Sequence, residues 1–142
     1  MMGRSKRAGA SAIVLAALAM GLAGCKTAAP TPPAPRNYLV FFHFDSADLS
    51  PEARQIVDQA AAGAKVMKPS TVAIAGFADK VGTPAYNQHL SERRIAAVQQ
   101  ALVADGVDPK LFLRIPLGDA DAAIEGTGDR RVEIRLSAAP GP

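Results

Sequence analysis

The sequence predicts an α+β fold, a two-layer α/β sandwich in which two helices cover one face of a mixed four-stranded sheet in βαβαββ order. Two observations predict it. Short runs of β-branched and aromatic residues alternate with two longer stretches that have helical periodicity. The last run, residues 131–136, alternates apolar and charged side chains with the period of a strand. A chain of 142 residues supplies material for one such domain.

The first strand and helix are predicted from residues 38–68. Residues 38–44 are β-branched and aromatic and end at Asp45, which indicates a buried strand followed by a turn. Ser50 is a favourable N-cap, Pro51 suits the first helical position and Pro69 ends the helix. The apolar residues between them share one stripe of the helix surface: Ala53, Ile56, Val57, Ala60, Ala64 and Met67.

The remaining elements follow in the same way. Residues 71–78 are predicted to form the second strand, and residues 79–84 a polar loop that leads into a second helix at about 85–105. Gly106 suits the C-terminal end of that helix. Residues 111–117 are predicted to form an edge strand because Pro116 lacks a backbone donor, and residues 118–129 a loop. In the fourth strand one face is apolar and directed inward: Val132, Ile134 and Leu136.

Composition excludes several classes of protein. One Cys cannot close an intramolecular disulfide, and one Cys with two His is a poor ligand set for structural zinc. The net charge of +3 arises from Arg4, Lys6 and Arg7, because without them 16 − 3 = 13 basic residues face 13 acidic ones. The sequence has no basic stripe with interleaved aromatic residues, which is the pattern that would indicate nucleic-acid binding. Nothing in the sequence calls for a cofactor.

The N-terminus is typical of a secretory signal. A cationic segment precedes an apolar run over residues 8–23, which is shorter than the about 20 residues of a transmembrane helix. Leu22-Ala23-Gly24-Cys25 resembles a bacterial lipobox, so residues 1–24 are predicted to be a lipoprotein signal peptide and Cys25 the lipidated residue. A free Cys beside an ordinary signal peptide is the alternative. In the lipoproteins that this motif resembles, Lys26 after the Cys indicates the outer membrane.

Residues 25–37 are predicted to form a tether, and residues 138–142 a disordered tail. Four prolines lie in the tether among alanine and threonine. This composition favours polyproline II, which gives a semi-rigid spacer with a reach of roughly 35 Å. The predicted domain therefore covers residues 38–137.

The second helix carries an unusual residue, Arg94, on its apolar half. An inward guanidinium keeps its charge and requires an anionic partner. Asn87 lies two turns earlier on the same face, and the loop with Asp79 directly precedes the helix. A carboxylate and a guanidinium at this spacing predict a receptor for a zwitterion, in which Asp79 binds an ammonium and Arg94 a carboxylate. An internal Asp79–Arg94 salt bridge without a ligand is the alternative.

Four segments resemble the OmpA-like peptidoglycan-binding domain, in family order and across nearly all of the predicted domain: residues 44–53, 76–82, 86–94 and 130–134. With the lipobox and tether, the chain resembles the peptidoglycan-associated lipoproteins. The resemblance implies a periplasmic, non-enzymatic domain that binds the free end of diaminopimelate in the peptide stems of the cell wall. It also implies partners: peptidoglycan, outer-membrane lipid through acylated Cys25, and Tol-type envelope proteins.

By position, the resemblance implies that Asp79 meets the diaminopimelate, that Arg94 holds its carboxylate and that Asn87 lies beside them. Asp45 and Arg130 would line the same pocket, and the backbone amide near Val81 would donate to the ligand: the full set of implied binding residues is Asp79, Arg94, Asn87, Asp45, Arg130 and Val81. Two departures concern the rim of this site. Phe77-Ala78 replaces a polar pair before the aspartate, and the loop over residues 118–129 is shorter than is usual in the family.

There are two alternatives to wall binding, an enzyme and an envelope scaffold. An enzyme would need a nucleophile and a base, but His89 and Ser91 point about 160° apart on a helix. His43 could act as a base, and Asp45 with Asp79 could form a glycosidase pair, yet Arg94 would spoil Asp79 as an acid. The second alternative is an envelope scaffold that keeps the fold and has lost wall binding.

Overall fold

The structure, a computed structural model, describes residues 33–120, 122 and 126–138. Its elements alternate in the predicted βαβαββ order. They are β1 (Arg36–Phe41), α1 (Pro51–Met67), β2 (Thr71–Phe77), α2 (Pro84–Ala104), the 3-10 helix η1 (Pro109–Leu111), β3 (Phe112–Gly118), the 3-10 helix η2 (Gly126–Asp129) and β4 (Arg131–Ser137). The two-layer fold class is confirmed.

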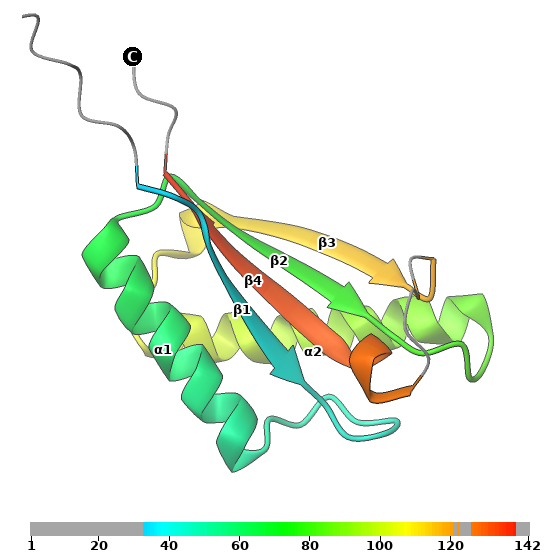
Figure 1. Cartoon of the computed structure of the whole chain (residues 1–142). Coiled ribbons are helices and arrows are strands. Elements are labelled where there is room, and N and C mark those ends of the chain that lie inside the picture. The colour runs from blue at the N-terminus through cyan, green and yellow to red at the C-terminus, as the bar shows by residue number, and fades with distance from the viewer. Residues whose placement is uncertain (1–32, 121, 123–125, 139–142) are drawn as a thin grey trace, which may run out of the picture.

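The strands form one mixed sheet in the order β1-β4-β2-β3 (Figure 1). β4 pairs antiparallel with both β1 and β2, whereas β2 and β3 are parallel. The last strand of the chain is therefore inserted at the centre of the sheet. β3 lies at an edge, as Pro116 predicted, and Pro116 pairs with Gly76 of β2.

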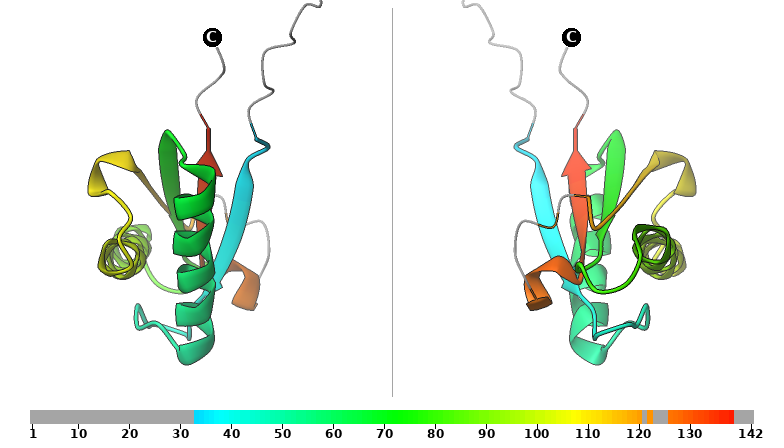
Figure 2. Two further views of the ribbon diagram at one scale, coloured as in Figure 1. Left: turned by 90° about the vertical axis from the view of Figure 1, so that its left-hand side faces the viewer. Right: turned by 90° about the vertical axis from the view of Figure 1, so that its right-hand side faces the viewer.

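Both helices cover the same face of the sheet. Figure 2 shows α1 lengthwise and α2 almost end-on in one view, so their axes are far from parallel. α1 packs against β1, and α2 packs against β2 and β3. Most buried side chains of the sheet point into this layer: Val40, Val72, Ile74, Val132, Ile134 and Leu136. Phe77 at the end of β2 is buried as well, and Arg131 lies 3.9 Å over its ring. Among the described residues, the buried core cluster runs from position 40 to position 136.

The prediction for β1 was wrong at both ends. The strand begins at Arg36, inside the predicted tether, and ends at Phe41 instead of residue 44. It ends early because the chain turns at Asp45, whose φ of 51° lies in the left-handed region, and Phe44 is 60% exposed. β1 is also an edge strand with its outer face open to solvent, so Leu39 and Phe41 are exposed and only alternate residues are buried.

The helix boundaries follow the predicted caps. The Ser50 side chain accepts a hydrogen bond from the amide of Ala53 at 3.1 Å, and Thr83 does the same for Tyr86 at 3.2 Å. α2 ends with Asp105 as its C-cap, and Gly106 follows with a φ of 90°, a conformation that suits glycine.

The predicted signal peptide, Cys25, most of the predicted tether and the end of the predicted tail lie outside the described residues. Within the described part of the chain, every helix is too short or too polar to cross a bilayer. The described chain enters at β1 and leaves at β4 from the same end of the sheet (Figure 1). The turn after β1 and the loop after β2 lie at the opposite end, which carries the candidate site.

Candidate functional site

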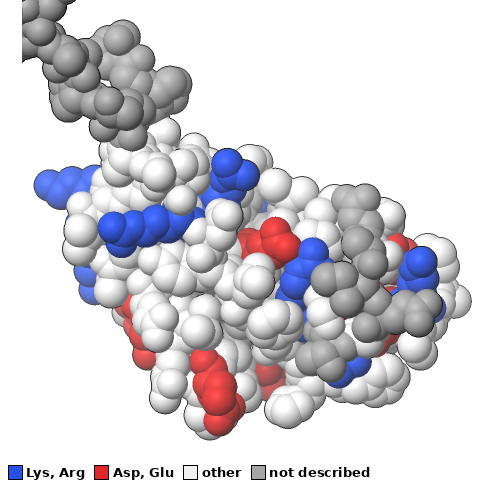
Figure 3. All heavy atoms as spheres, in the orientation of Figure 1, with Lys and Arg blue, Asp and Glu red and all other residues white. Residues whose placement is uncertain are grey.

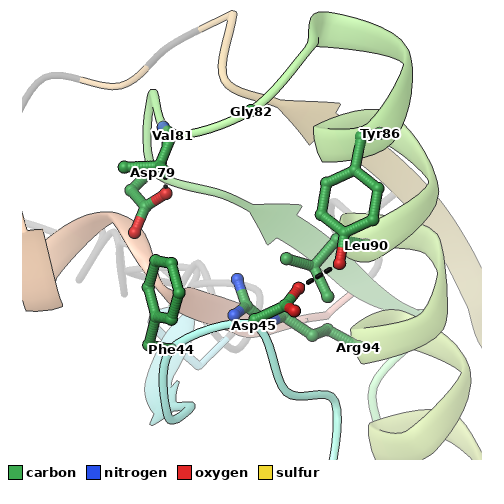
Figure 4. A pocket seen from close by; sticks show the side chains of 8 residues that line it. All are labelled: Phe44, Asp45, Asp79, Val81, Gly82, Tyr86, Leu90 and Arg94. Carbon is green, nitrogen blue, oxygen red and sulfur yellow. Dashed lines mark hydrogen bonds between the residues drawn. The ribbon is translucent and has the colours of Figure 1, made fainter.

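A pocket of about 200 Å³ lies at the end of the sheet remote from the termini. The turn after β1 contributes Phe44 and Asp45, and the loop after β2 contributes Asp79, Val81 and Gly82. The first turns of α2 complete the lining with Tyr86, Leu90 and Arg94. In Figure 4, Asp79 and Phe44 stand on one side of the opening, Tyr86 and Leu90 on the other, and Asp45 and Arg94 at its base.

Arg94 is fully buried at the base of this pocket. Its guanidinium donates three hydrogen bonds to backbone carbonyls: Nε to Ser46 at 2.8 Å, Nη1 to Phe77 at 2.9 Å and Nη2 to His43 at 3.2 Å. It also lies 5.3 Å from the centre of the Phe42 ring. The residue therefore ties the ends of β1 and β2 together.

The three carbonyls use three of the five N–H groups of the guanidinium. One N–H remains on each terminal nitrogen, and within the described residues neither has a protein acceptor. Burial lowers the pKa of Arg94 to about 10, while the charges of Asp79 and Asp45 act against that lowering. The group is thus a cation at neutral pH.

Asp79 lies on the wall of the pocket and is half-buried. Its Oδ1 accepts the backbone amide of Val81 at 3.1 Å, a local turn that holds the carboxylate in place. Its Oδ2 lies 3.6 Å from Nη1 of Arg130. The ion pair of Asp79 is therefore with Arg130, and no Asp79–Arg94 salt bridge is present among the described side chains.

Asp45 lies at the base of the pocket and accepts a hydrogen bond from the hydroxyl of Tyr86 (Figure 4). Its left-handed backbone, with a φ of 51°, is uncommon outside glycine and places the carboxylate opposite the start of α2. Two carboxylates and one guanidinium thus surround a single small cavity. That arrangement can pair with both charges of a zwitterion.

Asn87 is buried but does not line this pocket, because its side chain turns toward the loop after β3. Its Nδ2 donates to Oδ2 of Asp119 at 3.1 Å, and its Oδ1 has no hydrogen-bond partner in the described chain. Ser91 lies on the same side, where its Oγ accepts the amide of Gly118 at 3.3 Å. These residues join α2 to the end of β3, and Asn87 does not line the pocket beside Asp79 and Arg94 as the resemblance implied.

Val81 lines this pocket, whereas Arg130 lines only a neighbouring cavity. A second cavity of about 360 Å³ shares Phe44, Asp79 and Val81 with the first and adds Lys80, Gly126, Asp129 and Arg130. Nε of Arg130 donates to the carbonyl of Phe42 at 3.4 Å. The amide of Val81 already donates to Asp79, so it holds that carboxylate in place of the predicted contact with a ligand.

Sequence reasoning missed Tyr86, Leu90 and Phe44 as lining residues. The ring of Tyr86 is 39% exposed, and its hydroxyl donates to Asp45. The sequence feature that could have identified Tyr86 as a lining residue is a tyrosine in the first turn of a helix that follows a polar loop.

The catalytic pair considered above does not form. Ser91 is buried and bonded to the backbone, whereas His89 is exposed beside Glu92, with 3.3 Å between Nδ1 and Oε2. Across the described residues, no group of three His, Cys, Asp or Glu side chains is arranged to hold a metal ion.

Comparison with known proteins covers most of the domain. A profile described as the OmpA family matches residues 41–135. Outer membrane protein A of Bordetella avium is 39% identical over 106 residues, which cover 70% of this chain and 55% of that protein. The peptidoglycan-associated lipoprotein of Pseudomonas putida is 37% identical over 101 residues, which cover 67% and 60%. The chain thus spans less than two thirds of the length of these two relatives.

Two solved structures have the same fold as this domain. The OmpA-like domain of FopA1 from Francisella tularensis superposes with a TM-score of 0.68 at 25% identity, covering 75% of each chain. The peptidoglycan-associated lipoprotein from Burkholderia pseudomallei gives a TM-score of 0.64 at 27% identity, covering 68% of this chain and 87% of that one.

Proposed function

The chain belongs to the OmpA family, and from that membership and the charged pocket we propose that it binds cell-wall peptidoglycan without chemical conversion. The proposed ligand is the free end of diaminopimelate in a peptide stem, which is a zwitterion. The relatives named above as outer membrane proteins and peptidoglycan-associated lipoproteins support an envelope location. The observation that carries the proposal is the buried guanidinium of Arg94 at the base of a pocket with two carboxylates.

The size of the pocket favours an end group over a sugar chain. Its volume of about 200 Å³ is below the roughly 300–1,000 Å³ of pockets that enclose drug-sized ligands. A polymer must therefore be held by a small projecting group. The ammonium of that group would face Asp79 and Asp45, and its carboxylate would take the two remaining N–H groups of Arg94. Each charged hydrogen bond contributes about 1.5–3 kcal/mol.

The residues around this contact take supporting roles in the proposal. Arg130 positions Asp79 by its ion pair and borders the second cavity. The Val81 amide fixes the Asp79 carboxylate, and Asn87 fixes the start of α2 against Asp119. Cys25, acylated and held in the outer membrane, would connect that membrane to the wall through the tether, with Tol-type envelope proteins as further partners.

Co-sedimentation with purified peptidoglycan tests the proposal. The protein tested is residues 26–142, which contain the described core cluster at positions 40–136. We expect the parent chain to pellet with diaminopimelate-containing wall. The Asp79→Asn variant should stay in the supernatant. The control Asp108→Asn, at the other end of the domain, should pellet like the parent.

Two changes to the ligand test the same contacts without altering the protein. Acetylation of the free amine should abolish binding if Asp79 and Asp45 hold an ammonium. Wall with lysine in place of diaminopimelate keeps that amine but lacks the second carboxylate, so it should bind weakly if Arg94 holds a carboxylate. Equal pelleting with all three walls would refute the proposal. No pelleting of the parent chain would favour the envelope scaffold, and release of soluble wall fragments would favour an enzyme.

A further inference from the structure

Exposed cations gather at the end of the domain opposite the pocket. This is the end at which β1, β2 and β3 begin and β4 finishes. We call the group the cationic end, and its members are Arg36, Lys65, Lys68, Lys110 and Arg135. All five side chains are exposed, and within the described residues none takes part in an ion pair. Figure 3 shows Lys and Arg on this part of the visible face, near the point where the N-terminal segment leaves.

The three lysines surround a cavity or stand beside it. Lys65 lies in the last turn of α1, and Lys68 is the C-cap of that helix. Both line a cavity of about 280 Å³ against the turn after α2, together with Val107 and Leu111. Lys110 lies in η1, next to that lining.

Few negative charges compensate this group. Asp105 is paired with Arg54. Asp108 lines the same cavity and keeps its charge while it accepts the amide of Lys110 at 2.9 Å, so it offsets only part of the positive charge of the group. A lysine near the end of a helix is favoured by the helix dipole, which accounts for Lys65 and Lys68. It does not account for Arg36 and Arg135, which lie on strands. The excess of positive charge is therefore a property of the surface and not of one helix.

The opposite end of the domain carries both signs of charge, because Lys80, Arg94 and Arg130 lie there together with several carboxylates. Asp45, Asp48, Glu52 and Asp79 lie on the turn after β1, at the start of α1 and on the loop after β2. The domain thus has a positive end where the tether enters and carboxylates around the pocket. A negatively charged surface would turn the positive end toward itself.

We propose that the cationic end docks on an anionic lipid surface, the bilayer in which the tether is predicted to be anchored. This inference goes beyond wall binding and does not depend on it. Arg36 is the first residue of β1 and lies at the end of the predicted tether, so the anchored domain presents this end to the bilayer. A docked domain directs its pocket away from the lipid.

The length of the tether makes docking conditional. Its reach of roughly 35 Å exceeds the Debye length of about 8 Å at physiological ionic strength. A domain at full extension is screened from the bilayer, whereas one that folds back comes within range of the headgroups. Docking and full extension are therefore two separate positions of the same domain.

Neutron reflectometry on a supported bilayer tests this inference. Residues 25–142 are coupled through Cys25, the one cysteine of the chain, to a maleimide-bearing lipid. The bilayer is phosphatidylcholine with or without phosphatidylglycerol. We expect the protein layer to lie closer to the headgroups on the anionic bilayer by at least one Debye length, about 8 Å, and to move out at about 1 M NaCl.

Charge variants assign the effect to the cationic end. The triple variant Lys65→Gln, Lys68→Gln, Lys110→Gln should stay at the position seen on the neutral bilayer. The control, Lys80→Gln, Arg93→Gln, Arg114→Gln, removes three exposed charges elsewhere and should dock like the parent. Equal distances on the two bilayers would refute lipid docking and direct attention to an anionic protein or glycan. Docking by the triple variant would refute the assigned surface.

Discussion

Replacing Arg94 by methionine should destabilise the domain even without ligand, because the guanidinium satisfies three backbone carbonyls. Its bond to Phe77 is buried, and those to Ser46 and His43 are partly buried. An unsatisfied buried acceptor costs about 1–3 kcal/mol, and water can replace part of the loss at the other two carbonyls. Methionine also relieves the desolvation of a buried charge. We expect the free energy of unfolding to fall by about 2–4 kcal/mol.

Urea denaturation followed by circular dichroism measures this loss. With a slope of about 1–2 kcal/mol per molar urea, the midpoint should fall by roughly 2 M. The thermal midpoint should fall by roughly 10 °C or more. Arg93→Met is the matched control, because Arg93 is exposed and lies 5.8 Å over the Tyr86 ring. It should cost no more than about 1 kcal/mol.

The result for Arg94→Met also has a clear refuting outcome. If its urea midpoint matches that of Arg93→Met, the guanidinium does not hold the ends of β1 and β2 together. The three hydrogen bonds would then contribute nothing measurable to stability.

Three further predictions concern single positions. Gly76→Ala places a Cβ 2.7 Å from the carbonyl oxygen of Ser91. The substitution should lower the free energy of unfolding by about 1–3 kcal/mol. An unchanged urea midpoint would show that α2 can move away from β2. A backbone hydrogen bond at the start of α1 lowers the pKa of Glu52. The charged form of Glu52 therefore stabilises the fold above the ordinary pKa of a glutamate, and this stabilisation is lost as the pH falls through the lowered pKa of the folded state. Glu52→Gln should therefore flatten the acid side of a plot of urea midpoint against pH, and an unaltered slope would contradict this. Tyr86→Phe removes the hydroxyl that donates to the Asp45 carboxylate. Because this bond is exposed and water can replace part of it, co-sedimentation with wall should weaken about fivefold, the equivalent of about 1 kcal/mol. Equal binding would show that Asp45 needs no such support.

The elements of the fold were largely predictable because each depends on local signals. Ser50 with Pro51 marked the start of α1, and Gly106 marked the end of α2. The alternation along β4 identified its buried face, which is confirmed. β1 was the exception: the turn at Asp45 was predicted, but the strand already ends at Phe41 although the apolar run continues to residue 44.

The candidate site was predictable in part. An arginine on an apolar helix face indicated a buried cation, and Arg94 is fully buried. Its acceptors were not predictable, because a backbone carbonyl carries no sequence signature. The expectation of a negative partner therefore pointed to Asp79, whereas the structure pairs Asp79 with Arg130 and gives Arg94 three carbonyls.

By itself, the sequence determined the order of helices and strands, the inward faces and the presence of a charged residue where an apolar one belongs. These properties follow from periodicity and capping, which act between residues a few positions apart. Only the tertiary structure decided that β4 lies at the centre of the sheet and that Asp45 and Asp79 face Arg94 across one pocket. Such pairings join residues that are distant in the chain, and they depend on how the packed layers bring loop ends together.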